Sequence, residues 1–370
     1  MGSTEMIDWD VAVSTALRLV RPGPEVPRRT AFGAVSQLRE LAAEAGGHVG
    51  GFTGLVSAPG ANGASAHGSL MSNPASVVDR PSWVRVNADG FRVLMDPVVD
   101  AMSSRRSGVG AVPMVGRRLT GMQVGGVLAL LAGKVLGQYE IFGSDGRLLL
   151  VAPNIVAAER EMGVDPRDFR MWVCLHEVTH RVQFTANPWL RDHLAEQVEE
   201  FVAASDLDAA ALARRLKDAA GSLVGAARSG QDVSVIDLVT TPDQRVVVDR
   251  LTAVMSLLEG HADYVMDGVG PEVVPSVRTI RQRFSRRRAG GGVFDQLVRR
   301  LLGLDVKMRQ YAEGSRFVRE VVDAVGMSGF NRVWASPGTL PTREEIKTPE
   351  VWVARVHGAS RPGPGLAVTD

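Results

Sequence analysis

Hydrophobic residues recur at every third or fourth position through much of the chain, which is the period of a helix with one buried face. The clearest helix is predicted over residues 165–184, where Phe169 and Trp172 begin an apolar stripe. Asp165 stands at the N-cap, and Pro166 takes the first helical position, where its missing N–H costs nothing. Pattern and cap together predict one well-delimited helix.

A second long helix is predicted to begin at Pro242, with Thr241 as its N-cap. Gln244 completes a capping box with Thr241, because each side chain can bond the other residue's backbone N–H. Gly268 is predicted to end this helix, since glycine favours the position just after a helical C-terminus.

The other patterns predict more helices and one short strand. One helix is expected to close at Gly46 and Gly47, another to span 187–204, and a third to begin at a Ser205 cap. The apolar run Leu148–Val151 follows a Ser-Asp-Gly turn, which is typical of a strand. The predicted fold class is therefore mainly α with a small β element.

With 370 residues and 45% hydrophobic content, the chain can bury a large core. We expect a single domain over residues 7–357, in which 7–110 is a candidate N-terminal helical subdomain. A Gly-rich loop is expected over 57–69, and the tail 358–370 is expected to be disordered.

The overall charge argues against a polyanionic partner, because 42 Lys and Arg balance 41 Asp and Glu. The arginine-rich stretch 278–288 raises a nucleic-acid-binding module as an alternative. It shows no pattern of interleaved aromatic residues and no known binding motif, so a solvated helix face is the preferred interpretation. No nucleic-acid partner is predicted.

Cysteine usage favours a reducing compartment, because the single cysteine, Cys174, cannot form an intrachain disulfide. A buried, unreactive thiol is expected at this position. The N-terminal residues show no basic segment followed by an apolar run, so no signal peptide is predicted. These features predict a cytoplasmic protein.

One stretch, residues 119–139, requires a test for membrane insertion. Its uncharged apolar core runs only from Val124 to Gly133 and is interrupted at Lys134, whereas a span needs about 20 apolar residues. Its small residues suit close packing of a central buried helix in a soluble protein. No membrane partner is predicted.

Two histidines continue the apolar stripe of the helix over 165–184. His176 and His180 are four residues apart, so their rings lie on one face and can reach one metal ion. Glu177 lies about 100° round the helix from His176, where it can bond a metal-bound water instead of the metal. The alternative is two core histidines and a chance match. The spacing is the HExxH motif of zinc enzymes, which favours the metal site.

A catalytic zinc takes three protein ligands, so the third must come from elsewhere in the chain. On the helix that begins at Pro242, Glu259 continues an apolar stripe, where a carboxylate is costly unless it is paired or bound to metal. Asp263 shares that face and is predicted to accept a hydrogen bond from the far nitrogen of His176 or His180. His261 remains an alternative third ligand, and an arginine partner for Glu259 remains the alternative to any ligand role.

The stretches "LAGKVLGQYEIF", "LHEVTHRVQF", "LLEGHADYVMD", "LLGLDVKMRQYAEGSRFV" and "LPTREEIKTPEVWVARV" carry a resemblance to a known family. HExxH followed by ExxxD resembles the gluzincin arrangement of zinc metallopeptidases. More closely, the chain resembles an actinobacterial zincin-like family whose members are often labelled as associated with biosynthesis of the deazaflavin coenzyme. The resemblance covers about residues 80–357.

The resemblance implies a mostly helical zincin-like metallopeptidase fold and a metallohydrolase site at the positions that match its motifs. With zinc as cofactor, Glu177 would act as general base on water attacking a peptide or amide carbonyl. A non-catalytic zinc-binding or protein-interaction member of such a family is the alternative. A peptide or protein substrate is expected, but the sequence gives no cleavage specificity and no oligomeric state.

Overall fold

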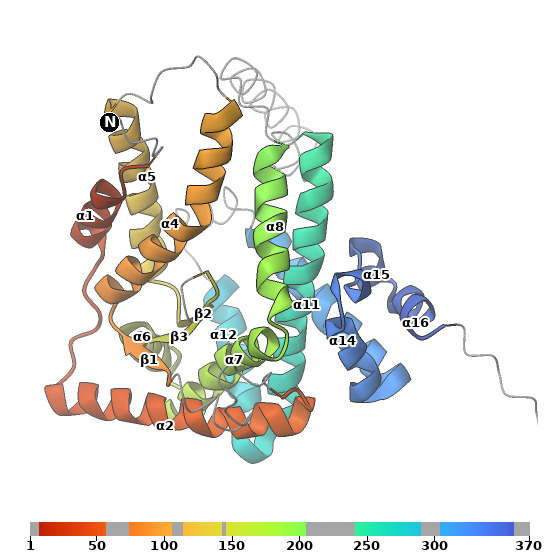
Figure 1. Ribbon diagram of the computed structural model, residues 1–370. Coiled ribbons are helices and arrows are strands. Elements are labelled where there is room, and N and C mark those ends of the chain that lie inside the picture. The colour runs from red at the N-terminus through yellow and green to blue at the C-terminus, as the bar shows by residue number, and fades with distance from the viewer. Residues whose placement is uncertain are drawn as a thin grey trace, which may run out of the picture.

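The computed structural model describes residues 7–56, 74–105, 114–142, 146–204, 241–289 and 304–358. Over these residues the protein is mostly helical, with one small sheet, as the sequence predicts (Figure 1). The helices are α1 (Trp9–Leu19), α2 (Arg28–Thr53), α4 (Arg80–Arg105), α5 (Met114–Ala132), α6 (Ala152–Met162), α7 (Pro166–Ala186), α8 (Trp189–Ala203), α11 (Pro242–Val273), α12 (Val277–Ala289), α14 (Leu304–Phe330), α15 (Arg343–Lys347) and α16 (Pro349–His357), with short 3-10 turns at Asn331–Trp334 and Pro337–Thr339. The predicted loop at 57–69, the helix capped by Ser205 and the tail after Gly358 lie outside the described residues.

The sheet has three strands in the order β1-β3-β2. Strand β3 (Arg147–Val151) pairs in parallel with β1 (Ser76–Val78) and antiparallel with β2 (Gly137–Glu140). All four residues of the apolar run Leu148–Val151 are buried, which confirms the predicted strand. A central strand covered on both faces has a near-continuous hydrophobic sequence.

The two faces of β3 point into different helical layers. Leu149 and Val151 pack with α1, α4 and α5, whereas Leu148 and Leu150 pack with α2, α6 and α7. This division follows from the period of two along a strand. In Figure 1, α2 and α7 accordingly lie below the sheet, whereas α1 and α5 lie above it.

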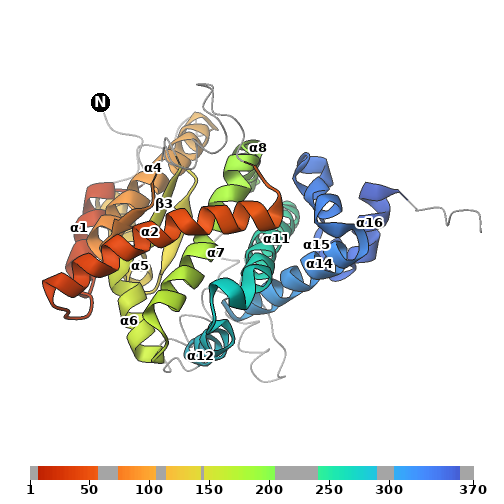
Figure 2. The same cartoon turned by 90° about the horizontal axis from the view of Figure 1, so that it is seen from below.

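Helix α7 lies between the sheet and the C-terminal helices, in contact with α2, α11 and β2 (Figure 2). Its predicted start is confirmed, because the Asp165 carboxylate accepts a hydrogen bond of 2.9 Å from the amide of Asp168. Pro166 takes the first position of the helix. Local sequence therefore determines where this helix begins.

Helix α2 does not close at Gly46 and Gly47 as predicted. It continues to Thr53 and ends at Gly54, which adopts the left-handed conformation with φ of 66°. Gly46 is buried in the interior of the helix. Tertiary packing has overridden the weak local preference of the glycine pair to end the helix.

Helix α11 begins with the predicted Thr241 capping box but does not end at Gly268. It continues to Val273 and bends at Gly270, where φ is 56°. Gly268 instead lies against the ring of Phe52, and a β-carbon there would overlap that ring. This glycine thus serves helix packing, and the prediction that it ends the helix was wrong.

Helices α11 and α14 cross with their backbones in contact. A β-carbon on Gly260 would overlap the backbone of Gly314, and one on Gly314 would overlap the carbonyl of Ser256. Only glycine permits so close an approach. The crossing fixes the segment of α11 that carries Glu259.

Helix α5 contains the stretch that was tested for membrane insertion. Gly121 and Gly125 pack against the backbone of α1 at Asp8 and Ala12. The outer face is solvent-exposed, including Val115 at 79%, so α5 is a surface helix and not the central one expected from its sequence. Among the described helices, none combines the length and the apolar character that a bilayer span requires.

Candidate metal centre

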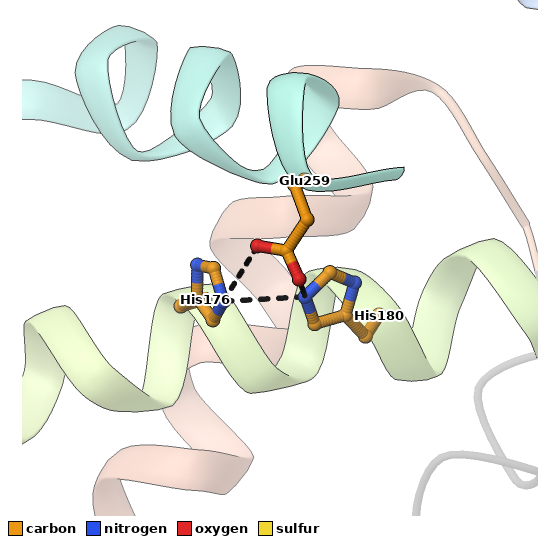
Figure 3. A group of neighbouring side chains, drawn as sticks. All are labelled: His176, His180 and Glu259. Atoms are coloured by element: carbon orange, nitrogen blue, oxygen red, sulfur yellow. Dashed lines mark hydrogen bonds and ion pairs between the residues drawn. The ribbon is translucent and has the colours of Figure 1, made fainter. Parts of the chain in front are cut away.

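The two histidines of α7 bring their ring nitrogens together. The Nε2 atoms of His176 and His180 are 3.2 Å apart, and the rings meet edge to face (Figure 3). The spacing of four residues places both rings on one side of the helix, as the sequence predicts. Two imidazole nitrogens therefore converge on a single position.

Glu259 approaches the same position from α11 (Figure 3). Its Oε2 lies 3.6 Å from His176 Nε2, and its Oε1 lies 3.8 Å from His180 Nε2. Among the described residues these three side chains form a group whose donor atoms all lie within 4.8 Å of one another. Packing of α7 against α11 joins residues that are 79 positions apart in the chain.

The donor set fits zinc in type, number and spacing. Two imidazoles and one carboxylate are a common set of protein ligands for a catalytic zinc. Ligands at the tetrahedral zinc distance of about 2.0–2.1 Å would lie about 3.4 Å from each other, close to the separations found here. The three side chains keep 15–26% of their surface exposed, so none of them is fully enclosed in the core.

Glu177 is more buried than either histidine of the apolar stripe. Its exposure is 7%, whereas the side chains of His176 and His180 keep 26% and 15%. Strand β2 covers this side of α7: a β-carbon on Gly137 would lie only 2.6 Å from Glu177 Cγ. The absent side chain of Gly137 leaves room for the Glu177 carboxyl group against the strand.

The surroundings of Glu177 favour its protonated form. Burial raises the pKa of its carboxyl group well above the ordinary value, and the negative charge of Glu259 raises it further. In the part of the chain that the structure describes, the Glu177 carboxylate has no hydrogen-bond donor or cation among its contacts. These surroundings raise the proton affinity of the Glu177 carboxylate.

His261, the alternative third ligand, faces away from the group. It is fully buried between Phe330 and Trp334, with ring centroids at 5.3 and 5.5 Å. Burial and, to a smaller extent, the nearby His180 together lower the pKa of its imidazole to about 3. It lies two residues after Glu259, which turns it about 200° round α11.

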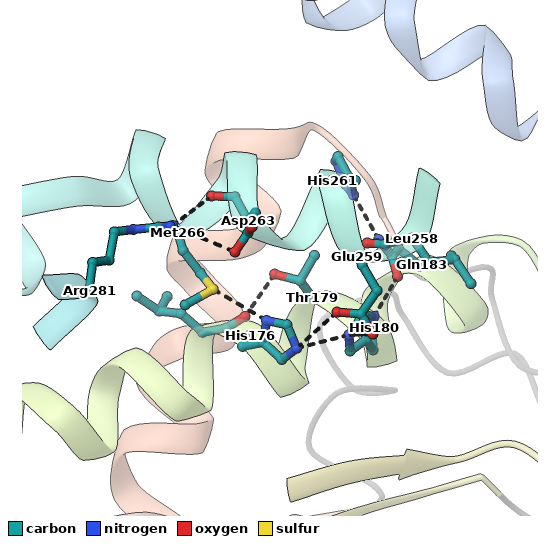
Figure 4. Close-up of polar contacts among 11 residues, drawn as sticks. His176, Thr179, His180, Gln183, Leu258, Glu259, His261, Asp263, Met266 and Arg281 are labelled. Carbon is teal, nitrogen blue, oxygen red and sulfur yellow. Dashed lines mark hydrogen bonds and ion pairs between the residues drawn. The ribbon is translucent and has the colours of Figure 1, made fainter. Parts of the chain in front are cut away.

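The far nitrogens of the two histidines have different neighbours (Figure 4). His180 Nδ1 lies 2.9 Å from the side-chain oxygen of Gln183, one turn further along α7. His176 Nδ1 lies 3.3 Å from the sulfur of Met266. Sequence reasoning overlooked both neighbours, although the i,i+3 spacing of His180 and Gln183 could have indicated the first.

Asp263 lies one turn beyond Glu259, on the His176 side of the group (Figure 4). Its carboxylate is 3.7 Å from Arg281 Nη2, and its backbone carbonyl accepts a hydrogen bond of 3.1 Å from the same guanidinium. The predicted bond from Asp263 to a ligand histidine stays a prediction.

Helix α12, which contains the arginine-rich stretch, pairs with the protein's own groups. Arg281 Nε lies 2.9 Å from Asp267, and Arg287 Nε lies 2.6 Å from Glu161. Arg283 donates to backbone carbonyls at the end of α6. At least three of these arginines therefore have an internal structural role.

Cys174 is buried, as predicted, and its thiol contacts the carbonyl of Leu38 at 3.8 Å. Burial, and then the charge of Glu177, raise the pKa of this thiol. A thiol with a raised pKa in an apolar site is unreactive and a poor metal ligand.

The chain is similar to known proteins over most of its length. The family model described as "Zincin-like metallopeptidase" matches residues 7–353. A solved structure described as "Crystal structure of a putative hydrolase with a novel fold from Chloroflexus aurantiacus" is 31% identical and covers 95% of this chain and 99% of its own, with a TM-score of 0.67. No curated protein matches the chain.

Proposed function

The chain belongs to the zincin-like metallopeptidase family, and on that premise we propose that it is a zinc-dependent hydrolase of peptide or amide bonds. The observation that carries the proposal is the pairing of two features on one helix turn. His176 and His180 converge with Glu259, and the buried Glu177 lies beside them without a compensating cation among the described residues. The hydrolase description of the structural neighbour supports the same reaction class.

His176, His180 and Glu259 would hold the zinc, and Glu177 would not be needed to retain it. Zinc, when bound, lowers the pKa of a coordinated water to about 7 and polarises a carbonyl. Glu177 would accept a proton from the attacking water and pass it to the leaving amine nitrogen. Gly137 gives Glu177 the space to keep its carboxyl group in place during both transfers.

The remaining expectations belong to the same proposal. We expect a peptide or protein substrate, a cytoplasmic location, and no nucleic-acid or membrane partner. The internal pairing of the α12 arginines supports the absence of a nucleic-acid role. The narrower labels of the resemblance, an actinobacterial family associated with deazaflavin-coenzyme biosynthesis, stay predictions.

The Glu177→Gln variant tests the catalytic role, because glutamine keeps the size of the side chain and removes the base. We expect the variant to fold, to retain zinc, and to cleave a broad peptide library about 10²–10⁴-fold more slowly than the wild type. Equal cleavage by both proteins would show that Glu177 is not the base. Cleavage by neither would favour a non-catalytic zinc-binding or interaction protein.

A second test concerns the third ligand and measures zinc retention by elemental analysis. Glu259→Ala removes a donor from the metal position, so we expect the variant to lose nearly all its zinc. His261→Ala removes a buried ring outside the group, so it should lower stability and leave the zinc content largely intact. The opposite result would make His261 the ligand.

A further inference from the structure

The side-chain amide of Gln183 lies at a junction between α7 and α11. Its Oε1 is 2.9 Å from His180 Nδ1, and its Nε2 is 2.9 Å from the backbone carbonyl of Leu258. The same Nε2 is 3.0 Å from His261 Nδ1, and Gln183 itself is fully buried. Every polar atom of this amide therefore has a protein partner (Figure 4).

The Leu258 carbonyl determines which way the amide points. A backbone carbonyl only accepts hydrogen bonds, so the group that faces it must be the amide nitrogen. The reversed amide would place two oxygens 2.9 Å apart at a buried site, where an unsatisfied polar group costs about 1–3 kcal/mol. The second N–H of the nitrogen then points to His261 Nδ1, which accepts it.

This orientation in turn determines the hydrogen on His180. An amide oxygen only accepts, so the His180 Nδ1 that faces it must carry the hydrogen. The neutral ring then has its lone pair on Nε2, the atom that faces His176 and Glu259. A metal binds an imidazole through that lone pair.

We propose that Gln183 is a positioning residue, which the Leu258 carbonyl orients and which holds His180 in the Nδ1–H tautomer with Nε2 directed at the metal position. Leu258 directly precedes Glu259, so one turn of α11 both supplies a ligand and orients another. The inference rests on the proposed function only in taking these donors as metal ligands, and it does not require peptide cleavage.

His176 is held differently, which makes the assignment specific to His180. Its Nδ1 faces the thioether of Met266, a weak acceptor on a flexible side chain. No other side chain is fixed at both ends in this way around the group of His176, His180 and Glu259, among the contacts described.

The direct experiment determines the tautomer of His180 in the zinc-free wild type. Protein labelled with ¹⁵N-histidine would be studied by long-range ¹H–¹⁵N NMR at about pH 8, where imidazole is neutral, with a His180→Gln variant to assign the signals. We expect the hydrogen on Nδ1. A hydrogen on Nε2 would overturn the proposal. This measurement stands whether or not the wild type takes up zinc, whereas failure to take up zinc would count against the proposed function.

Variants then test the effect on the metal. Gln183→Leu removes the acceptor, so His180 should lose its single tautomer and the zinc dissociation constant should rise about 10–100-fold. Gln183→Glu restores an acceptor but not the donors, so it should recover the tautomer and much of the affinity while leaving the protein less stable.

The matched control is Gln197→Leu on α8, which also removes a buried amide; its Nε2 lies 3.4 Å from the Glu200 carboxylate, and no described contact joins it to His176 or His180. It should leave both the tautomer and the zinc affinity unchanged. If Gln183→Leu binds zinc as tightly as the wild type and keeps the Nδ1–H tautomer, the proposal is wrong. If Gln183→Leu does not fold, the tautomer of the wild-type protein decides.

Discussion

Three of the buried glutamates differ in what faces their carboxyl groups: Glu159 and Glu345 each lie in a clamp formed by an arginine, whereas Glu177 lies in the candidate metal centre. Glu159 and Glu345 are 5% exposed, and Glu177 is 7% exposed. Arg170 bonds both carboxylate oxygens of Glu159, and Arg355 bonds both oxygens of Glu345 at 2.6 and 2.9 Å. Glu177 has no arginine in the described surroundings.

The pKa values follow the difference in surroundings. Burial by itself would raise the pKa of Glu345, but hydrogen bonds from Arg355 and Thr342 outweigh it and the net shift is downward. Burial raises the pKa of Glu177, and Glu259 adds to the rise. Glu159 and Glu345 thus each face an arginine, whereas Glu177 faces no arginine among the described residues and has a raised proton affinity.

The largest difference in stability is expected between the Glu159→Gln and Glu177→Gln variants. Glu159→Gln leaves the buried Arg170 without its carboxylate, which should lower the free energy of unfolding by about 3–5 kcal/mol. Glu177→Gln removes the repulsion by Glu259 and the burial of a charge, so the zinc-free variant should be at least as stable as the wild type. Urea denaturation of the zinc-free proteins measures both free energies of unfolding. Similar losses of stability in the two variants would contradict the distinction between Glu159, held by Arg170, and Glu177.

An intermediate effect is expected for the two aspartates of α11 that share Arg281. Asp263→Ala should weaken zinc binding by about 10–100-fold if its carboxylate supports a ligand histidine. Asp267→Ala removes the closer ion pair to Arg281, at 2.9 Å, and should leave zinc binding unchanged. Zinc titration of both variants decides, and equal affinities would assign Asp263 to the ion pair with Arg281 alone.

The smallest effect is expected at the C-terminal clamp under acid conditions. The folded-state pKa of Glu345 lies below its unfolded value, so its contribution to stability is present above about pH 4.5 and is lost as the pH falls through the folded pKa. Because the Arg355 side chain is 39% exposed, this contribution should be only about 1 kcal/mol. Glu345→Gln should therefore flatten the acid side of the stability profile, measured as melting temperature against pH. An unchanged profile would contradict the assignment.

Features coded by neighbouring residues could be predicted from the sequence. The Asp165 cap, the Thr241 capping box and the strand at Leu148–Val151 depend on local geometry, and all three are confirmed. The convergence of His176 and His180 is likewise a matter of helical spacing.

A residue whose role depends on a partner far away in the sequence could be predicted only where its residue type is unusual for the expected surroundings. Glu259 was found because a carboxylate on an apolar stripe needs an explanation, and the structure places it 3.6 and 3.8 Å from the two histidines. Gly268 is not unusual in this sense, because the preference of glycine for the end of a helix already explains its position. The contact with Phe52 that explains it comes from another helix.

The burial of Glu177 could not be predicted for the same reason. It depends on Gly137 in strand β2, which has no side chain and so leaves room for Glu177. This contact arises only when β2 packs against α7, which the sequence does not show. The proposed role of Gln183 depends on the backbone carbonyl of Leu258. Every residue has such a carbonyl, so the sequence does not indicate which one matters.

The residues of the candidate metal centre are synthesised before the residues of α14 that pack against α11. Glu259 is synthesised before Gly314, yet the next residue on its helix, Gly260, meets Gly314 backbone to backbone. His261 likewise packs on Phe330, at the end of α14. In a nascent chain that has not reached α14, His176, His180 and Glu259 are all synthesised, but the face of α11 that α14 covers has no partner yet. A metal bound by these three side chains would therefore meet its final ligand geometry only after α14 has been synthesised and has packed against α11.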